Sequence, residues 1–99
     1  MILVLGTVRL APDNLERARA AMDAVISASR AEDGCIAYSY AQDVLDPTIV
    51  HVVEKWRDRE TLDAHFRTPH LQEWRATWDD IGITDRKLTI FDIDEGSPI

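Results

Sequence analysis

The chain has 99 residues, enough for one domain that buries roughly 65% of its unfolded surface without disulfides or structural metals. Eighteen acidic against eleven basic residues give a net charge of -7, and the basic residues are scattered, which argues against nucleic acid or an acidic lipid surface as a partner. One cysteine, no secretion leader and no apolar run of about 20 residues predict a cytoplasmic protein without a membrane span.

The chain opens with a predicted strand and helix. Residues 2–10 are apolar and rich in β-branched side chains, which predicts a strand, and apolar residues spaced three or four apart predict a helix over 14–32. Asp13 followed by Glu16 resembles a capping box at the helix start, and Gly34 is a natural end.

A hairpin is predicted next. Residues 35–44 and 49–56 alternate in the manner of strands, and the "LDPT" segment between them predicts a turn, because proline fixes φ and aspartate can bond the following backbone. The two strands should therefore pair in antiparallel fashion.

The last third predicts a broken helical unit and a final strand. Asp58 is a plausible N-cap for a helix over 59–67, and Pro69 interrupts the pattern before a further helical segment that ends at Gly82. Residues 86–94 then predict the last strand.

The resulting order is βαββαβ. It predicts an α+β, ferredoxin-like domain over residues 1–94, with a four-stranded antiparallel sheet, both helical units on one sheet face, and a C-terminal tail over 95–99. The first three predicted strands carry large apolar side chains on both faces, so we expect the open sheet face to be covered by a second copy in a homodimer.

Four short motifs resemble one known family, the antibiotic biosynthesis monooxygenase domain. They are Gly34-Cys35, Glu54-Lys55-Trp56, Ala64-His65 and Pro69-His70. The resemblance implies a dimeric α+β barrel with an apolar pocket between sheet and helices, and an enzyme that oxygenates phenols, hydroquinones or polycyclic aromatics without a flavin or metal. Other members of the wider superfamily isomerise small metabolites or degrade haem. Thr7 and His65 stand where the haem-degrading members have asparagine and tryptophan, which makes that activity improbable.

No motif for a cofactor or metal is visible. The chain lacks a GxGxxG after its first strand and lacks a P-loop. His65 and His70 are five residues apart across a proline, so they do not share a helix face, and no two-histidine-plus-carboxylate cluster is predicted. With no cofactor and no metal, the electrons for O2 would have to come from the substrate.

Three residues are predicted to be catalytic: His65, Glu54 and Trp56. His65 faces inward and is the favoured base, because histidine exchanges protons near neutral pH, although it could equally be a core histidine satisfied by Glu54 or a backbone carbonyl. Glu54 lies on an apolar strand face, so it should be hydrogen-bonded or have a raised pKa, in a functional or a purely structural role. Trp56 could line a pocket or only fill the core.

Five further residues are predicted to bind the substrate: Phe66, His70, Trp74, Tyr38 and Arg75. Three of them also have a structural alternative. His70 could cap a helix, and Tyr38 with Tyr40 could pack across a dimer. Arg75 could form a surface ion pair with Glu73 or Asp79 instead of binding a carboxylate or phenolate.

These features predict a cofactor-independent monooxygenase that oxidises a quinol or another phenolic small molecule with O2. Two alternatives stay open. One is a cofactor-free isomerase that uses the same histidine and glutamate, and the other is a non-catalytic dimeric protein that binds a small molecule.

Overall fold

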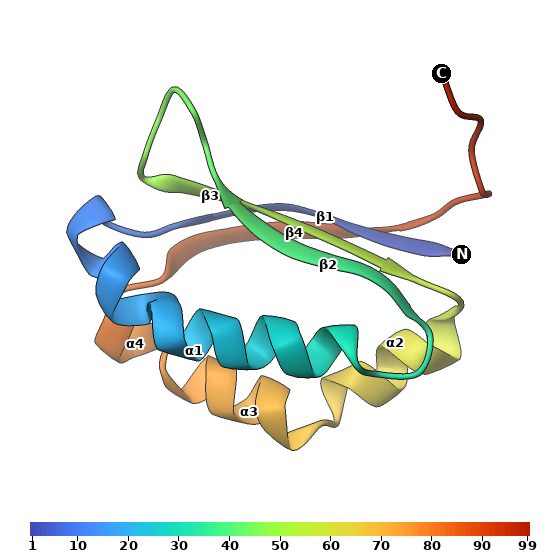
Figure 1. Cartoon of the computed structure of the whole chain (residues 1–99), viewed down its shortest axis with the longest axis horizontal. Helices are drawn as coiled ribbons and strands as arrows, with labels where there is room; N and C mark the ends of the chain where they lie inside the picture. The colour runs from blue at the N-terminus through green and yellow to red at the C-terminus, as the bar shows by residue number, and fades with distance from the viewer.

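The computed structural model describes residues 1–99 and has two layers, a four-stranded sheet and a set of helices that all lie on one side of it (Figure 1). The elements in chain order are β1 (Ile2–Arg9), α1 (Pro12–Arg30), β2 (Cys35–Gln42), β3 (Ile49–Trp56), α2 (Arg59–Phe66), α3 (Pro69–Ala76), α4 (Trp78–Ile81) and β4 (Thr84–Asp92). None of the helices is long and apolar enough to cross a membrane.

The sheet has the order β2-β3-β1-β4, and every neighbouring pair is antiparallel. The predicted ferredoxin-like α+β fold is therefore confirmed. The register pairs Val4 with Glu54 and Glu54 with Tyr38, so these three side chains stand in one row across the helix-covered face.

The core lies between the two layers. One apolar cluster joins the middle of the sheet to α1 and α3, and a second joins Ile2, Val4 and Tyr38 to Trp56 and Leu62 near the start of α2. The opposite sheet face is covered by no element of the chain, and the loop after β2 rises on that side (Figure 1).

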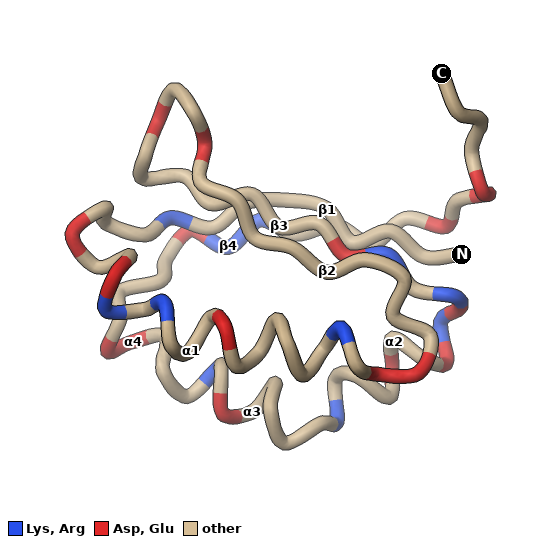
Figure 2. Tube along the Cα trace, viewed as in Figure 1, with Lys and Arg blue, Asp and Glu red and all other residues tan.

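Charged residues are spread over helices, loops and strand ends, and no basic stripe follows any element (Figure 2). β2, an edge strand, carries no charged residue at all.

Several predicted boundaries differ from the structure. α1 begins at Pro12 with no side-chain cap, so the predicted capping box of Asp13 and Glu16 is wrong: proline at the first helical position already supplies the required φ. α1 also ends at Arg30, before the predicted residue 32, and Gly34 lies in the following turn with φ of +84°.

β2 stops at Gln42 because the Asp43 carboxylate accepts bonds from the backbone N–H groups of Leu45 and Asp46, which turns the chain. β4 runs over residues 84–92, two positions earlier than predicted, and residues 93–99 form no helix or strand.

Two predicted helix ends are confirmed. Asp58 caps α2 by accepting a bond from Thr61 N–H at 2.9 Å, and Gly82 ends α4 in a left-handed conformation with φ of +80°.

Candidate functional site

A cavity between the sheet and the helical layer is the candidate active site. Its empty volume, with the open mouth and the solvent space there included, is about 430 Å³. Most of its lining is apolar, and the polar groups are few. The lining residues are Val8, Tyr38, Tyr40, Val52, Glu54, His65, Phe66, Leu71, Trp74, Arg75, Trp78, Ile83, Arg86 and Leu88.

Glu54 brings a carboxyl group into this apolar interior because its place on β3 turns it toward the helices. It is 6% exposed, and its Oε1 accepts a bond from Trp56 Nε1 at 3.1 Å. Burial raises the pKa of Glu54, against the weaker lowering effects of the Trp56 bond, His65 and Arg86. The expectation was that Glu54 is hydrogen-bonded or has a raised pKa, and the bond from Trp56 confirms it.

His65 lies at the inner end of the cavity, on α2, and is 1% exposed. Its Nε2 lies 3.9 Å from Glu54 Oε1, and its ring lies 4.7 Å from Trp56 between centroids. Its Nδ1 lies only 2.5 Å from Oε2 of Glu32, a residue that the sequence did not single out. The predicted inward orientation of His65 is confirmed.

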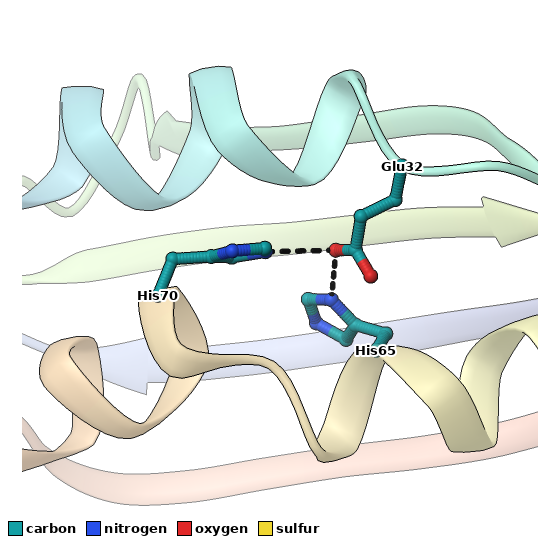
Figure 3. Close-up of side chains that lie close together, drawn as sticks. All are labelled: Glu32, His65 and His70. Atoms are coloured by element: carbon teal, nitrogen blue, oxygen red, sulfur yellow. Dashed lines mark hydrogen bonds and ion pairs between the residues drawn. The ribbon is translucent and has the colours of Figure 1, made fainter.

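Glu32 sits in the turn after α1 and meets two histidines at once. Both His65 Nδ1 and His70 Nε2, at 2.5 and 2.9 Å, approach the same carboxylate oxygen, as Figure 3 shows. No lysine or arginine pairs with Glu32, and its side chain is 14% exposed. An ionised carboxylate only accepts, so both rings donate to it, which leaves Nε2 of a neutral His65 as an acceptor beside the cavity.

The same three residues bring together donor atoms that could hold a divalent cation, because the two ring nitrogens and one carboxylate oxygen lie within 4.8 Å of one another. The inference that no two-histidine-plus-carboxylate cluster exists is therefore wrong. Spacing along the chain does not reveal this cluster, because its carboxylate belongs to Glu32, in a turn that is far from both histidines in the sequence. That the protein binds no metal stays a prediction.

The structure places four of the five predicted substrate-binding residues on the cavity wall: Tyr38, Phe66, Trp74 and Arg75. His70 is not among the lining residues; it bonds Glu32, and the cap of α3 that was the alternative for it is supplied by Thr68. Trp56 is fully buried behind His65 and does not reach the cavity.

Both tyrosines of β2 face the helices, so the alternative that they pack across a dimer is wrong. Their hydroxyl oxygens lie 3.2 Å apart, and burial raises the pKa of both phenols. Arg75 forms no ion pair with Glu73 or Asp79, since the chain's ion pairs lie elsewhere. His51, whose position on β3 alternates with that of Glu54, is exposed and lies 2.7 Å from Asp43 Oδ1.

The fold and the cavity lead to one family. Residues 1–77 match the model of the antibiotic biosynthesis monooxygenase family, so this chain belongs to that family. The motifs from Gly34-Cys35 to Pro69-His70 all fall within the matched segment.

Among its relatives, an uncharacterised protein of Synechocystis sp. is 34% identical over 94 residues, which are 95% of this chain and 64% of the relative. A protein of Mycobacterium tuberculosis that bears the name of a monooxygenase is 38% identical over 65 residues, 66% of this chain and 63% of the relative. The chain thus matches less than two thirds of the length of either relative.

Solved structures agree on the fold. A crystal structure from Deinococcus radiodurans, described as a candidate antibiotic biosynthesis monooxygenase, superposes with a TM-score of 0.90 at 23% identity and covers 100% of this chain and 98% of its own. The structure of the mycobacterial relative superposes with a TM-score of 0.77 at 29% identity and covers 97% and 98% of the two chains.

Proposed function

We propose that this protein is a cofactor-independent monooxygenase that oxidises a quinol or a related phenol with O2. The observation that carries the proposal is the placement of His65: a buried imidazole in the lining of a mostly apolar cavity, with its Nδ1 held by Glu32 and its Nε2 on the side of Glu54. This arrangement suits a base that deprotonates a phenol in a water-poor site.

The first step is proton transfer. A phenolic O–H bond breaks, the proton moves to Nε2 of His65, and the electron pair stays on the substrate oxygen. The resulting imidazolium lies between the carboxyl groups of Glu32 and Glu54, at 2.5 and 3.9 Å, where opposite charge stabilises it.

The phenolate then supplies all the electrons. One electron passes to O2, and superoxide and the phenoxyl radical combine to form a C–O bond on the ring. Loss of water gives an overall balance in which a quinol and O2 become a hydroxyquinone and H2O. One oxygen atom enters the product and the other leaves as water, so the balance requires no external reductant.

Oxygen uptake with a panel of hydroquinones tests the proposal. We expect uptake that matches product formation, and His65→Ala should lower turnover by about tenfold or more while far-UV circular dichroism stays unchanged. His51→Ala is the matched control, since His51 is exposed and paired only with Asp43. Conversion that proceeds equally well under nitrogen would replace the monooxygenase with an isomerase, and unchanged turnover in His65→Ala would remove His65 from the mechanism.

We further propose that the protein is a homodimer joined through the uncovered sheet face. Leu5 and Phe91, on that face, are 45% and 44% exposed, and Val44 and Leu45 at the tip of the loop after β2 are 96% and 92% exposed. Exposed apolar groups of this number on one side of a small domain favour burial by a second copy.

A further inference from the structure

The mouth of the cavity carries two arginines that have no acidic partner. They are Arg75 on α3 and Arg86 on β4, and both line the cavity. Six of the nine arginines of the chain have a side-chain hydrogen bond or ion pair, with Arg67, Arg75 and Arg86 as the exceptions. In a chain with eighteen acidic residues against eleven basic ones, two such arginines at one cavity leave a local positive charge without a counter-ion.

A third donor lies beside them. Trp78 also lines the cavity, and its indole Nε1 is buried without an acceptor. The guanidinium of Arg86 lies 5.3 Å from the centroid of the Trp78 ring, a cation–π contact that holds it near this donor. Since buried donors are normally satisfied, the unpaired indole N–H indicates a place for an acceptor oxygen of a ligand.

The charge of Arg86 also acts inside the cavity. It lowers the pKa of both Glu54 and Tyr40, although burial acts more strongly in the opposite direction on each. Glu54 is the one carboxyl group in the lining, and burial raises its pKa.

We propose that the ligand of this cavity is a flat aromatic compound with a carboxylate substituent, which Arg75 and Arg86 bind at the mouth while the ring lies against the apolar interior. The inference rests on the proposed function in placing the substrate in this cavity, and it deepens that function by naming the substrate class as phenolic acids. Arginine suits this role because its planar guanidinium offers paired N–H donors to a carboxylate.

Binding of a matched pair of probes tests the proposal: 1-hydroxy-2-naphthoate and 1-hydroxy-2-naphthamide, which share a ring and differ in charge. Titration under nitrogen, followed by the fluorescence of the chain's tryptophans or by calorimetry, should show the acid binding about tenfold or more tighter than the amide. Arg75→Gln and Arg86→Gln should each weaken binding of the acid by about tenfold and leave the amide unchanged, and added salt should weaken only the acid.

Arg67→Gln is the matched control, because Arg67 also lacks a side-chain partner but does not line the cavity. Equal affinity for acid and amide, a loss in Arg67→Gln as large as in the other two variants, or no binding of either probe would overturn the proposal. Melting curves establish that each variant is folded. The binding experiment measures no turnover, so a failure to take up oxygen would refute the monooxygenase and leave the binding of aromatic acids unaffected. Oxygen uptake without charge-dependent binding would refute only the proposed carboxylate on the substrate.

Discussion

One carboxylate oxygen of Glu32 accepts hydrogen bonds from both His65 and His70, and this shared acceptor determines which ring nitrogen of His65 carries no proton. A carboxylate that only accepts keeps the proton on Nδ1 and leaves Nε2 beside the cavity as the base. A glutamine at the same position offers an N–H₂ group as well as an oxygen, so it permits the other tautomer.

For Glu32→Gln we therefore expect the 15N chemical shifts of His65 to move from the Nδ1–H tautomer toward the Nε2–H tautomer, and turnover to fall by about tenfold or more. Asp43→Asn is the control, because it changes the exposed His51 pair in the same way far from the cavity. Unchanged His65 shifts would refute the positioning role of Glu32, and recovery of both signals in Glu32→Asp would support it. A shift that appears only when Zn²⁺ is added would instead assign the cluster to a metal.

Glu54 determines a second prediction, on stability. Burial raises its pKa in the folded state, so the folded protein binds more protons than the unfolded chain, and stability falls as the pH rises from the ordinary pKa of a glutamate toward the higher folded-state pKa. The groups around it are Trp56, His65 and Tyr38, with Arg86 and Glu32 acting from further away.

Glu54→Gln keeps the oxygen that accepts from Trp56 and removes the charge. We expect the free energy of unfolding of this variant to exceed that of the wild type by about 1 kcal/mol at pH 7.5, the scale of the cost of burying one incompletely bonded polar group. The difference should shrink as the pH falls toward 4.5. Urea unfolding across this range measures the difference. If the stability of the variant relative to the wild type instead rose toward low pH, the ionised Glu54 would stabilise the fold, which would contradict the prediction.

At the scale of elements, the turn between α1 and β2 decides where Glu32 lies. Gly34 in this turn has φ of +84°, and a Cβ placed on it would clash with the side chain of Thr61 on α2. The turn thus lies directly against α2, which brings Glu32 to the histidines.

Gly34→Ala should lower the free energy of unfolding by about 2 kcal/mol or more, from the left-handed backbone and the clash together. The double variant Gly34→Ala/Thr61→Ala should recover only the part due to the clash. Urea unfolding of the three proteins separates the two contributions, and a Gly34→Ala protein as stable as the wild type would contradict this account of the turn.

Sequence patterns predicted the elements better than they predicted the site. Alternation in 49–56 and helical spacing around His65 were sufficient to place Glu54 and His65 on facing surfaces, because a strand or helix determines the direction of its own side chains. Glu32 could not be predicted: Asp33 beside it is also acidic, and only the packing of the turn against α2 distinguishes the buried residue from the exposed one. Arg86 was missed for the same reason, since only the fold brings it beside Trp78 at the cavity.

At the scale of the whole molecule, the uncovered sheet face makes the assembly testable. We expect sedimentation equilibrium at micromolar concentration to give a mass near twice the 11.2 kDa of one chain. Leu5→Asp should shift the protein to the monomer, because it places a charge in the middle of the proposed interface, whereas Ser27→Asp on the exposed side of α1 should not. A wild type that sediments as a monomer would exclude the sheet-to-sheet dimer.

The central position of β1 also governs when the fold can form during synthesis. β1 pairs only with β3 and β4, which the ribosome delivers about half a chain and nearly a whole chain later. During synthesis, the apolar residues 2–9 therefore remain unpaired until β3 has been made, and β2, which is made earlier, does not pair with them. The nascent chain passes through its most aggregation-prone stage before Trp56 emerges, so slowing translation between β1 and β3 should lower the yield of folded protein more than slowing it after β4.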